Sequence, residues 1–152
     1  MVAVCVAISG ICCVIDLIIK SKVEDNTIQP QNLKMLPIEI KKAHNAGFAM
    51  NLREDKPHVV RCVSCVAMIM ALLYQMFLLG CQKRTAEKIS GALALGGALS
   101  NFYDRMTRGY VVDYISVKTK YKKASSVVFN IADVCILLGS VGLLLFRKGK
   151  KD

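Results

Sequence analysis

The longest stretch of the chain without a charged residue runs from residue 62 to residue 82. As a helix rising about 1.5 Å per residue, this stretch covers the roughly 30 Å hydrocarbon core of a bilayer. Three more apolar runs are interrupted by at most one aspartate: 2–19, 89–103 and 124–146. The sequence therefore predicts an all-α membrane protein with four transmembrane helices, at about 2–19, 60–82, 86–104 and 125–146.

The composition supports a membrane protein and argues against a nucleic-acid-binding one. Hydrophobic residues make up 54% of the 152 residues, and the mean hydropathy is +0.42. A net charge of +10 is compatible with nucleic acid, but the chain has no Trp, and its lysines flank apolar runs instead of lining an aromatic stacking surface. We therefore expect membrane phospholipid, and no nucleic acid, as a partner.

Four crossings place both termini on one side of the membrane and the loops at about 20–59 and 105–124 on the other. The two loops carry more Lys and Arg in total, but these residues are densest close to helix ends, at 83–88 and 147–152. Because the positive-inside bias is strongest near helix ends, the termini are expected in the cytoplasm.

Short β-like stretches occur in both expected loops, at 36–40 and 46–52 in the first and at 109–117 in the second. They predict a small extracytoplasmic β-containing region. The chain is expected to form a single integral membrane domain, 1–152, because it is short and has only three prolines.

Seven cysteines, an odd number, lie mostly inside apolar runs, so no disulfide framework is expected. Cys62 and Cys65 have redox or metal spacing, but they open a spanning helix with no second pair nearby, and packing is the favoured interpretation. His44 and His58 have no companion ligands, so no metal site is expected. The basic tract 118–123 is interpreted as a solvated face near lipid phosphates, with direct substrate binding as the alternative.

Carboxylates within or beside a membrane span are costly unless they are paired or face water, so each is a candidate functional group. Asp16 lies four residues before Lys20, and an intrahelical ion pair accounts for it. Asp104 adjoins Arg105 at the end of the third helix, where it can cap the helix or pair locally. Asp16, Lys20 and Asp104 are therefore interpreted as structural support.

No local ion pair of this kind accounts for Asp113 and Asp133 together. Asp133 lies near the start of the fourth helix, where the helix dipole alone also favours a carboxylate. Asp113 lies on the short connection returning from the third helix, so the two carboxyls can meet at one membrane depth. In a poorly hydrated pocket one of them keeps its proton, and the pair can act as acid and base, as in aspartic peptidases.

The two aspartates belong to a set of motifs that follow one another along nearly the whole chain: Asp16-x-x-x-Lys20, Asn45-Ala46-Gly47-Phe48-Ala49, Gly97 to Arg105, Gly109 to Asp113 and Phe129 to Asp133. In these motifs the chain resembles the lipoprotein signal peptidases, also called signal peptidase II. The last three motifs together are highly specific. The chain departs from the family's usual residues at Ser100, Phe48 and Met50.

The resemblance implies an aspartic endopeptidase whose catalytic dyad is Asp113 and Asp133. Its substrate is then a prolipoprotein whose lipobox cysteine already carries a diacylglyceryl group, cut just before that cysteine. The resemblance also implies no metal or cofactor, a monomer, and a multi-pass location in the bacterial cytoplasmic membrane with the active site toward the extracytoplasmic face. The residues implied to line the pocket are Asn45, Gly47, Asn101, Arg105 and Asn130, with Gly97 among the supporting residues.

A small non-enzymatic membrane transporter or channel subunit is the alternative, because such proteins also use intramembrane carboxylates. It would usually place them near the bilayer midplane, whereas Asp104, Asp113 and Asp133 are expected toward one face. Small residues of the third helix, such as the pairs Ala92/Gly96 and Gly96/Ser100, predict close helix contacts under either function.

Overall fold

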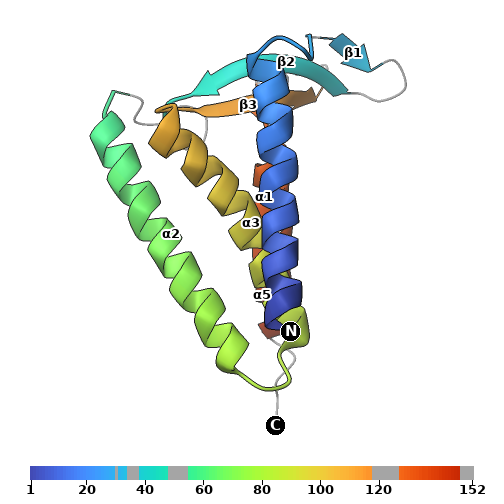
Figure 1. Cartoon of the computed structure of the whole chain (residues 1–152), viewed down its shortest axis with the longest axis vertical. Coiled ribbons are helices and arrows are strands. Elements are labelled where there is room, and N and C mark those ends of the chain that lie inside the picture. Colours follow the sequence, from blue (N-terminus) through green and yellow to red (C-terminus); the bar gives the residue numbers. More distant parts are fainter. Residues whose placement is uncertain (30, 34–37, 48–54, 118–126, 148–152) are drawn as a thin grey trace.

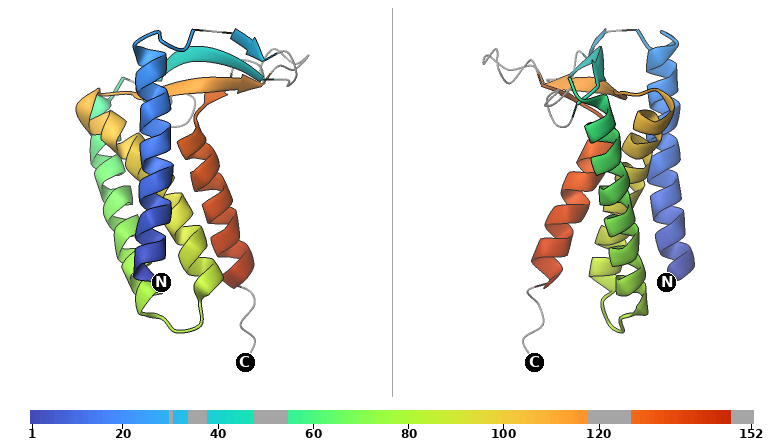
Figure 2. Two further views of the ribbon diagram at one scale, coloured as in Figure 1. Left: turned by 45° about the vertical axis from the view of Figure 1, so that its right-hand side comes forward. Right: turned by 90° about the vertical axis from the view of Figure 1, so that its left-hand side faces the viewer.

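The computed structural model describes residues 1–29, 31–33, 38–47, 55–117 and 127–147. These residues form four helices: α1 (Val2–Glu24), α2 (Pro57–Gly80), α3 (Thr85–Thr107) and α5 (Ile131–Arg147). They also form four strands: β1 (Gln31–Leu33), β2 (Ile38–Asn45), β3 (Val111–Val117) and β4 (Val128–Phe129). The helices form a bundle, the sheet lies across one end of it, and the start of α1 and the end of α5 lie at the other end (Figure 1 and Figure 2).

Helix α3 is the central helix and packs against α1, α2 and α5. Small residues allow the backbones to approach closely, as the sequence predicted. On the α1 side, the Ser9 hydroxyl donates to the Ala92 carbonyl at 2.7 Å, and a Cβ on Gly96 would lie 2.7 Å from the Ser9 carbonyl oxygen. On the α5 side, a Cβ on Gly97 would collide with the Ala132 carbonyl. Any larger residue at either glycine would push the helices apart.

The bundle exposes a largely apolar surface. Helices α1 and α2 are each long and apolar enough to cross a membrane, by length and composition. Large apolar side chains are also exposed along α5: Val134, Leu137, Leu138, Val141, Leu144, Leu145 and Phe146. Water would make such a surface unfavourable, whereas lipid tails accommodate it.

The sheet is antiparallel, with strand order β1-β2-β3-β4. In the pairing of β2 with β3, Ala43 lies opposite Asp113 and Asn45 lies opposite Val111, with a register irregularity between Ile40 and Ala43. Since alternate residues of a strand share a face, this register makes Asn45 a diagonal neighbour of Asp113.

The prediction of a mainly helical chain with a small β-containing part is confirmed, but several boundaries were wrong. The fourth helix begins at Ile131 and not near 125, because Val128 and Phe129 pair with β3 and Asn130 caps the helix. Helix α1 continues past residue 19 to Glu24, since Lys20 is buried and paired instead of ending the helix. Helix α2 begins at Pro57, a residue favoured in the first helical turn.

The β-like stretches were only partly correct. Strand β3 agrees with the predicted 109–117, and Asp113 lies outside a helix as expected. The first loop contains strands β1 and β2, and β2 (Ile38–Asn45) includes residues 38–40 of the first predicted stretch but ends before the second predicted stretch begins at residue 46. Residues 36–37 and 48–52 of the predicted stretches lie outside the described residues. Phe48, Met50 and the basic tract 118–123 lie outside them as well.

Candidate active site

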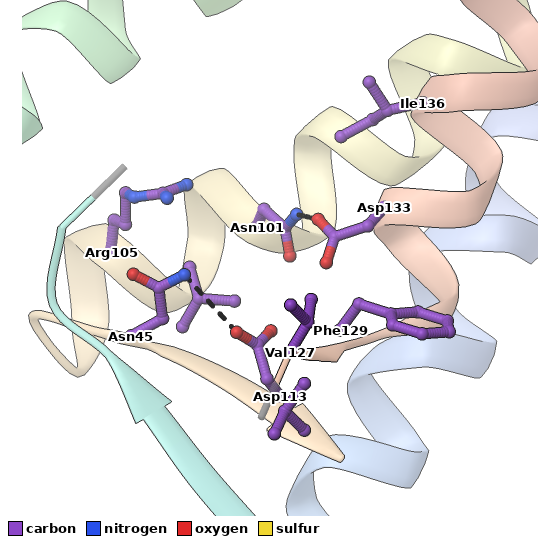
Figure 3. Close-up of a pocket in the computed structure, with 10 residues that line it drawn as sticks. Asn45, Asn101, Arg105, Asp113, Val127, Phe129, Asp133 and Ile136 are labelled. Carbon is purple, nitrogen blue, oxygen red and sulfur yellow. Dashed lines mark hydrogen bonds between the residues drawn. The ribbon is translucent and has the colours of Figure 1, made fainter. Parts of the chain in front are cut away.

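Asp113 and Asp133 reach the same pocket from different elements. Asp113 is the third residue of β3, and Asp133 lies in the first turn of α5. The pocket has a volume of about 310 Å³ and is lined by residues from the sheet and from α3 and α5. Both carboxylates point into it (Figure 3). The other lining residues are Asn45, Asn101, Arg105, Val111, Val127, Val128, Phe129 and Ile136.

Asp133 is held by the start of its own helix. The Asn130 side-chain oxygen accepts a hydrogen bond from the Asp133 backbone N–H at 2.9 Å, and the Asn130 backbone N–H donates to Asp133 Oδ2 at 3.1 Å. This reciprocal arrangement is a capping box with a carboxylate at the third helical position. The second carboxylate oxygen, Oδ1, accepts from the Asn101 amide at 2.8 Å (Figure 3). Both oxygens of Asp133 are therefore held in place.

Asn130 also holds Asp113. The buried Asn130 amide donates to Asp113 Oδ1 at 2.7 Å, and the Asn45 amide donates to Asp113 Oδ2 at 3.4 Å. Burial, together with the charge of Asp133, raises the pKa of Asp113 to about 6, although these two hydrogen bonds act in the opposite direction. Asn130 thus contacts both carboxylates and sets their relative position.

Arg105 borders the pocket from α3 and is half-buried. Its guanidinium donates to the Gly47 carbonyl at 3.1 Å, which joins the end of β2 to α3. Two polar atoms at this edge of the pocket, Arg105 Nε and Asn45 Oδ1, are buried and have no hydrogen-bond partner within the described part of the chain. Within the described residues, a donor and an acceptor beside the pocket are therefore left unsatisfied.

A buried charge cluster lies behind the pocket. The fully buried ammonium of Lys20 lies 2.8 Å from Asp16 and 3.1 Å from Asp104, so the predicted Asp16–Lys20 pair is present but is part of a larger group. Lys20 also donates to Asn101 Oδ1 at 2.7 Å. Because an ammonium can only donate, this contact turns the Asn101 amide nitrogen toward Asp133.

Asp104 pairs locally, as expected, but its partner is Arg108 and not the adjacent Arg105. Arg108 donates to Asp104 Oδ1 at 2.7 Å, while Asp104 Oδ2 accepts from the Val112 backbone N–H at 3.2 Å. Asp104 thereby connects α1, α3 and β3. Arg105 is left to face the pocket.

Sequence reasoning missed two residues of this cluster. The Tyr114 hydroxyl donates to Asp16 Oδ1 at 2.7 Å, and the Ser100 hydroxyl donates to Asp16 Oδ2 at 2.6 Å. Tyr114 follows Asp113 on β3, and since neighbouring strand residues face opposite sides, the pattern could have placed it behind the site. Ser100, noted as a departure from the family pattern, gave no signal of this contact.

Most of the sequence-predicted site residues come together. Asn45, Asn101 and Arg105 line the pocket, while Asn130 lies buried beneath the two aspartates. Gly47 contributes its carbonyl to Arg105. The residues interpreted as structural support lie one layer further from the pocket: Asp16, Lys20, Gly97 and Asp104.

Comparison with known proteins identifies the family. The sequence pattern of the family described as signal peptidase (SPase) II matches residues 8–147, nearly the whole chain. The chain belongs to the signal peptidase II family. A relative from Caldicellulosiruptor bescii, named lipoprotein signal peptidase, is 35% identical over 136 residues, which cover 88% of this chain and 82% of that protein.

Other relatives and solved structures agree. A lipoprotein signal peptidase from Acinetobacter baumannii is 38% identical over 104 residues, covering 67% of this chain, and the match spans only 58% of that relative's length. A bacterial membrane enzyme solved by the in meso method at 2.3 Å resolution has the same fold, with a TM-score of 0.82 at 21% identity over 100% of this chain and 93% of that one. The chain therefore shares its fold with that membrane enzyme.

Proposed function

We propose that this protein is an intramembrane aspartic endopeptidase that removes the signal peptide from diacylglyceryl-modified prolipoproteins, cutting just before the lipidated cysteine. The observation that carries the proposal is the contact of Asn130 with both aspartates. It holds Asp113 and Asp133 at one pocket, and burial together with the neighbouring charge raises the pKa of Asp113. Family membership supplies the substrate class.

We propose that the pair shares one proton, and the raised pKa of Asp113 favours Asp113 as the member that holds it. The ionised Asp133 takes a proton from a water molecule, whose oxygen attacks the scissile carbonyl carbon, while Asp113 donates its proton to the carbonyl oxygen. Asp133 then donates the proton that it took from water to the leaving nitrogen as the C–N bond breaks, and a hydroxyl of the tetrahedral intermediate returns a proton to Asp113 as the new carboxyl group forms. Both carboxylates are restored for the next turnover.

The unpartnered atoms at the pocket edge suit a peptide backbone. Arg105 Nε can donate to a substrate carbonyl, and Asn45 Oδ1 can accept from a substrate N–H. Filling both satisfies buried polar atoms that are otherwise unpaired. These two residues are therefore proposed to set the register of the substrate against the dyad.

Lys20 is proposed as a positioning residue that acts through Asn101. By fixing the Asn101 amide it keeps a hydrogen-bond donor on Asp133 Oδ1 and so holds the orientation of that carboxylate in the pocket. Asp16 and Asp104 keep the ammonium itself compensated.

We further propose that all four helices cross the cytoplasmic membrane of a bacterium as a single monomeric domain, 1–152. The start of α1 and the last turn of α5 lie at one end of the bundle, and the sheet lies at the other end (Figure 2). On the proposed topology the first end lies in the cytoplasm, and the sheet with the dyad lies at the extracytoplasmic face. The apolar exterior of α1, α2 and α5 supports this placement. A protease-protection assay on both ends of the bundle in oriented vesicles tests it.

The activity is tested by incubating the purified protein with a diacylglyceryl-modified prolipoprotein and following the mass of the product. We expect cleavage just before the modified cysteine, and an unlipidated precursor that stays uncut, because two acyl chains anchor the peptide at about 0.8 kcal/mol per buried methylene. Equal processing of both precursors would reject the proposed substrate class. No cleavage of either would reject the activity.

A further inference from the structure

A second cavity lies outside the dyad pocket and shares no residue with it. It has a volume of about 440 Å³ and lies between α1 and the last turns of α3. Its apolar wall comes from Val14, Leu17 and Ile18 of α1 and from Tyr103 of α3. Ile18 and Tyr103 are half exposed, so the cavity is a groove on the apolar exterior of the bundle.

Two cations border this groove at its sheet end. Arg108 is held in place because it donates to Asp104 at 2.7 Å and to the Ser21 hydroxyl at 3.3 Å. Lys22 forms no ion pair among the residues that the structure describes. The nearby Glu24 does not neutralise it, because that carboxylate is bound to Lys42 and His44.

The groove changes from apolar to cationic along one helix face. Val14, Ile18 and Lys22 are spaced by four residues, so they share a face of α1 and span about 12 Å along its axis. The cationic end lies toward the sheet, where the bundle ends, and the apolar end lies along the middle of α1. This order matches an amphiphile with an anionic head at a membrane surface and a tail directed into the bilayer.

We propose that this groove binds one anionic phospholipid, with its phosphate between Lys22 and Arg108 and one acyl chain along Ile18 and Val14. A soluble anion could contact the two cations but would gain nothing from the apolar part of the groove. An uncharged diglyceride could fill the apolar part but would gain nothing from the two cations. The proposal goes beyond the peptidase activity and needs only that this end of the bundle lies at a membrane surface.

Bound lipid would act on the fold through Arg108. The guanidinium joins Ser21 at the end of α1 to Asp104 of α3, so a phosphate on Arg108 adds a third contact to this junction. A ligand that binds only the folded state raises the melting temperature. The effect is measurable without any substrate, so its failure is distinct from a failure of the proposed peptidase.

The test uses the purified full chain in an uncharged detergent, with binding followed by native mass spectrometry and by thermal unfolding. We expect phosphatidylglycerol to be retained at one molecule per chain and to raise the melting temperature. Phosphatidylcholine, diacylglycerol and inorganic phosphate should each bind at least about tenfold more weakly. Equal binding of inorganic phosphate, or of phosphatidylcholine, would overturn the proposal.

Two variants locate the site. Lys22→Gln should weaken phosphatidylglycerol binding about tenfold, and Ile18→Ser should weaken it by removing apolar contact. Lys56→Gln is the matched control, since Lys56 is an exposed lysine at the sheet end of α2 and its replacement makes the same change in net charge. Unchanged binding in Lys22→Gln, or an equal loss in Lys56→Gln, would show that the lipid is attracted only by general charge and would overturn the assignment.

Discussion

The ammonium of Lys20 lies 2.7 Å from the amide oxygen of Asn101, and both residues are buried. The amide nitrogen of Asn101 lies 2.8 Å from Asp133 Oδ1. Lys20 does not line the pocket, yet it determines that Asp133 faces a hydrogen-bond donor. Burying an ion pair is costly, so a cluster of this kind is better explained by the positions it fixes than by net stability.

Asp113→Asn and Asp133→Asn should each lower turnover by at least about a thousandfold, with the fold intact, because asparagine keeps the shape but cannot exchange the proton. The double variant should lose little more than either single variant, since the two groups act as a unit. Turnover per folded molecule is the measurement. Substantial activity in Asp113→Asn would exclude the strand aspartate as a catalytic residue.

Lys20→Met and Asp16→Asn should separate positioning from stability. Each breaks a fully buried ion pair and should cost about 3 kcal/mol of unfolding free energy. Lys20→Met should also lower turnover per folded molecule, since the Asn101 amide is freed to turn, whereas Asp16→Asn should not. Glu39→Gln, which breaks the partly exposed pair with Lys41, is the control and should cost less than about 1 kcal/mol. Equal turnover in Lys20→Met and Asp16→Asn would argue against positioning.

Asn130 allows its two roles to be tested apart. Asn130→Ala should cost about 1 kcal/mol through loss of the helix cap and should also abolish most activity. Asn130→Ser keeps an oxygen able to cap α5 but has no amide to donate to Asp113. It should therefore restore stability without restoring turnover. Recovery of both by serine would mean that capping alone is required.

The raised pKa of Asp113 predicts a pH dependence of stability. The folded protein holds this proton more tightly than the unfolded chain, whose carboxyl titrates near 3.9. The stabilisation from this group is therefore present below about pH 4 and is lost as the pH rises through about 6. Asp113→Asn should remove that loss, so its melting temperature should gain on the parent between pH 4.5 and pH 7.5. A difference in melting temperature between variant and parent that stays constant across this range would contradict the raised pKa of Asp113.

Gly97→Ala should lower both the melting temperature and the turnover, because the added Cβ meets the Ala132 carbonyl and pushes away the helix that carries Asp133. Gly10→Ala is the matched control on α1, where an added Cβ has nothing within 4 Å. It should leave activity unchanged and slightly raise stability, since alanine favours a helix by about 1 kcal/mol. Similar losses of melting temperature and turnover in both variants would mean that replacing any helical glycine is harmful, and not the contact at Ala132 in particular.

The sequence predicted the helical class and the strand around Asp113 because apolar runs and β-branched residues carry a strong local signal. It did not predict the start of α5, because the apolar run continues through Val128 and Phe129, and only pairing with β3 makes them a strand. The Asp16–Lys20 pair was visible from its spacing of four residues. Its partners Tyr114 and Asp104 were not, since they come from elements that only tertiary packing brings to α1.

The capping box at the start of α5 has a consequence for biogenesis. The same Asn130 side chain begins the helix and holds Asp113, so neither carboxylate is in place until α5 has docked on the sheet. A nascent chain that has inserted only its first helices therefore lacks an assembled dyad. On the proposed function, hydrolytic power then arises only when α5 docks, and an incompletely folded chain would leave neighbouring membrane proteins uncut.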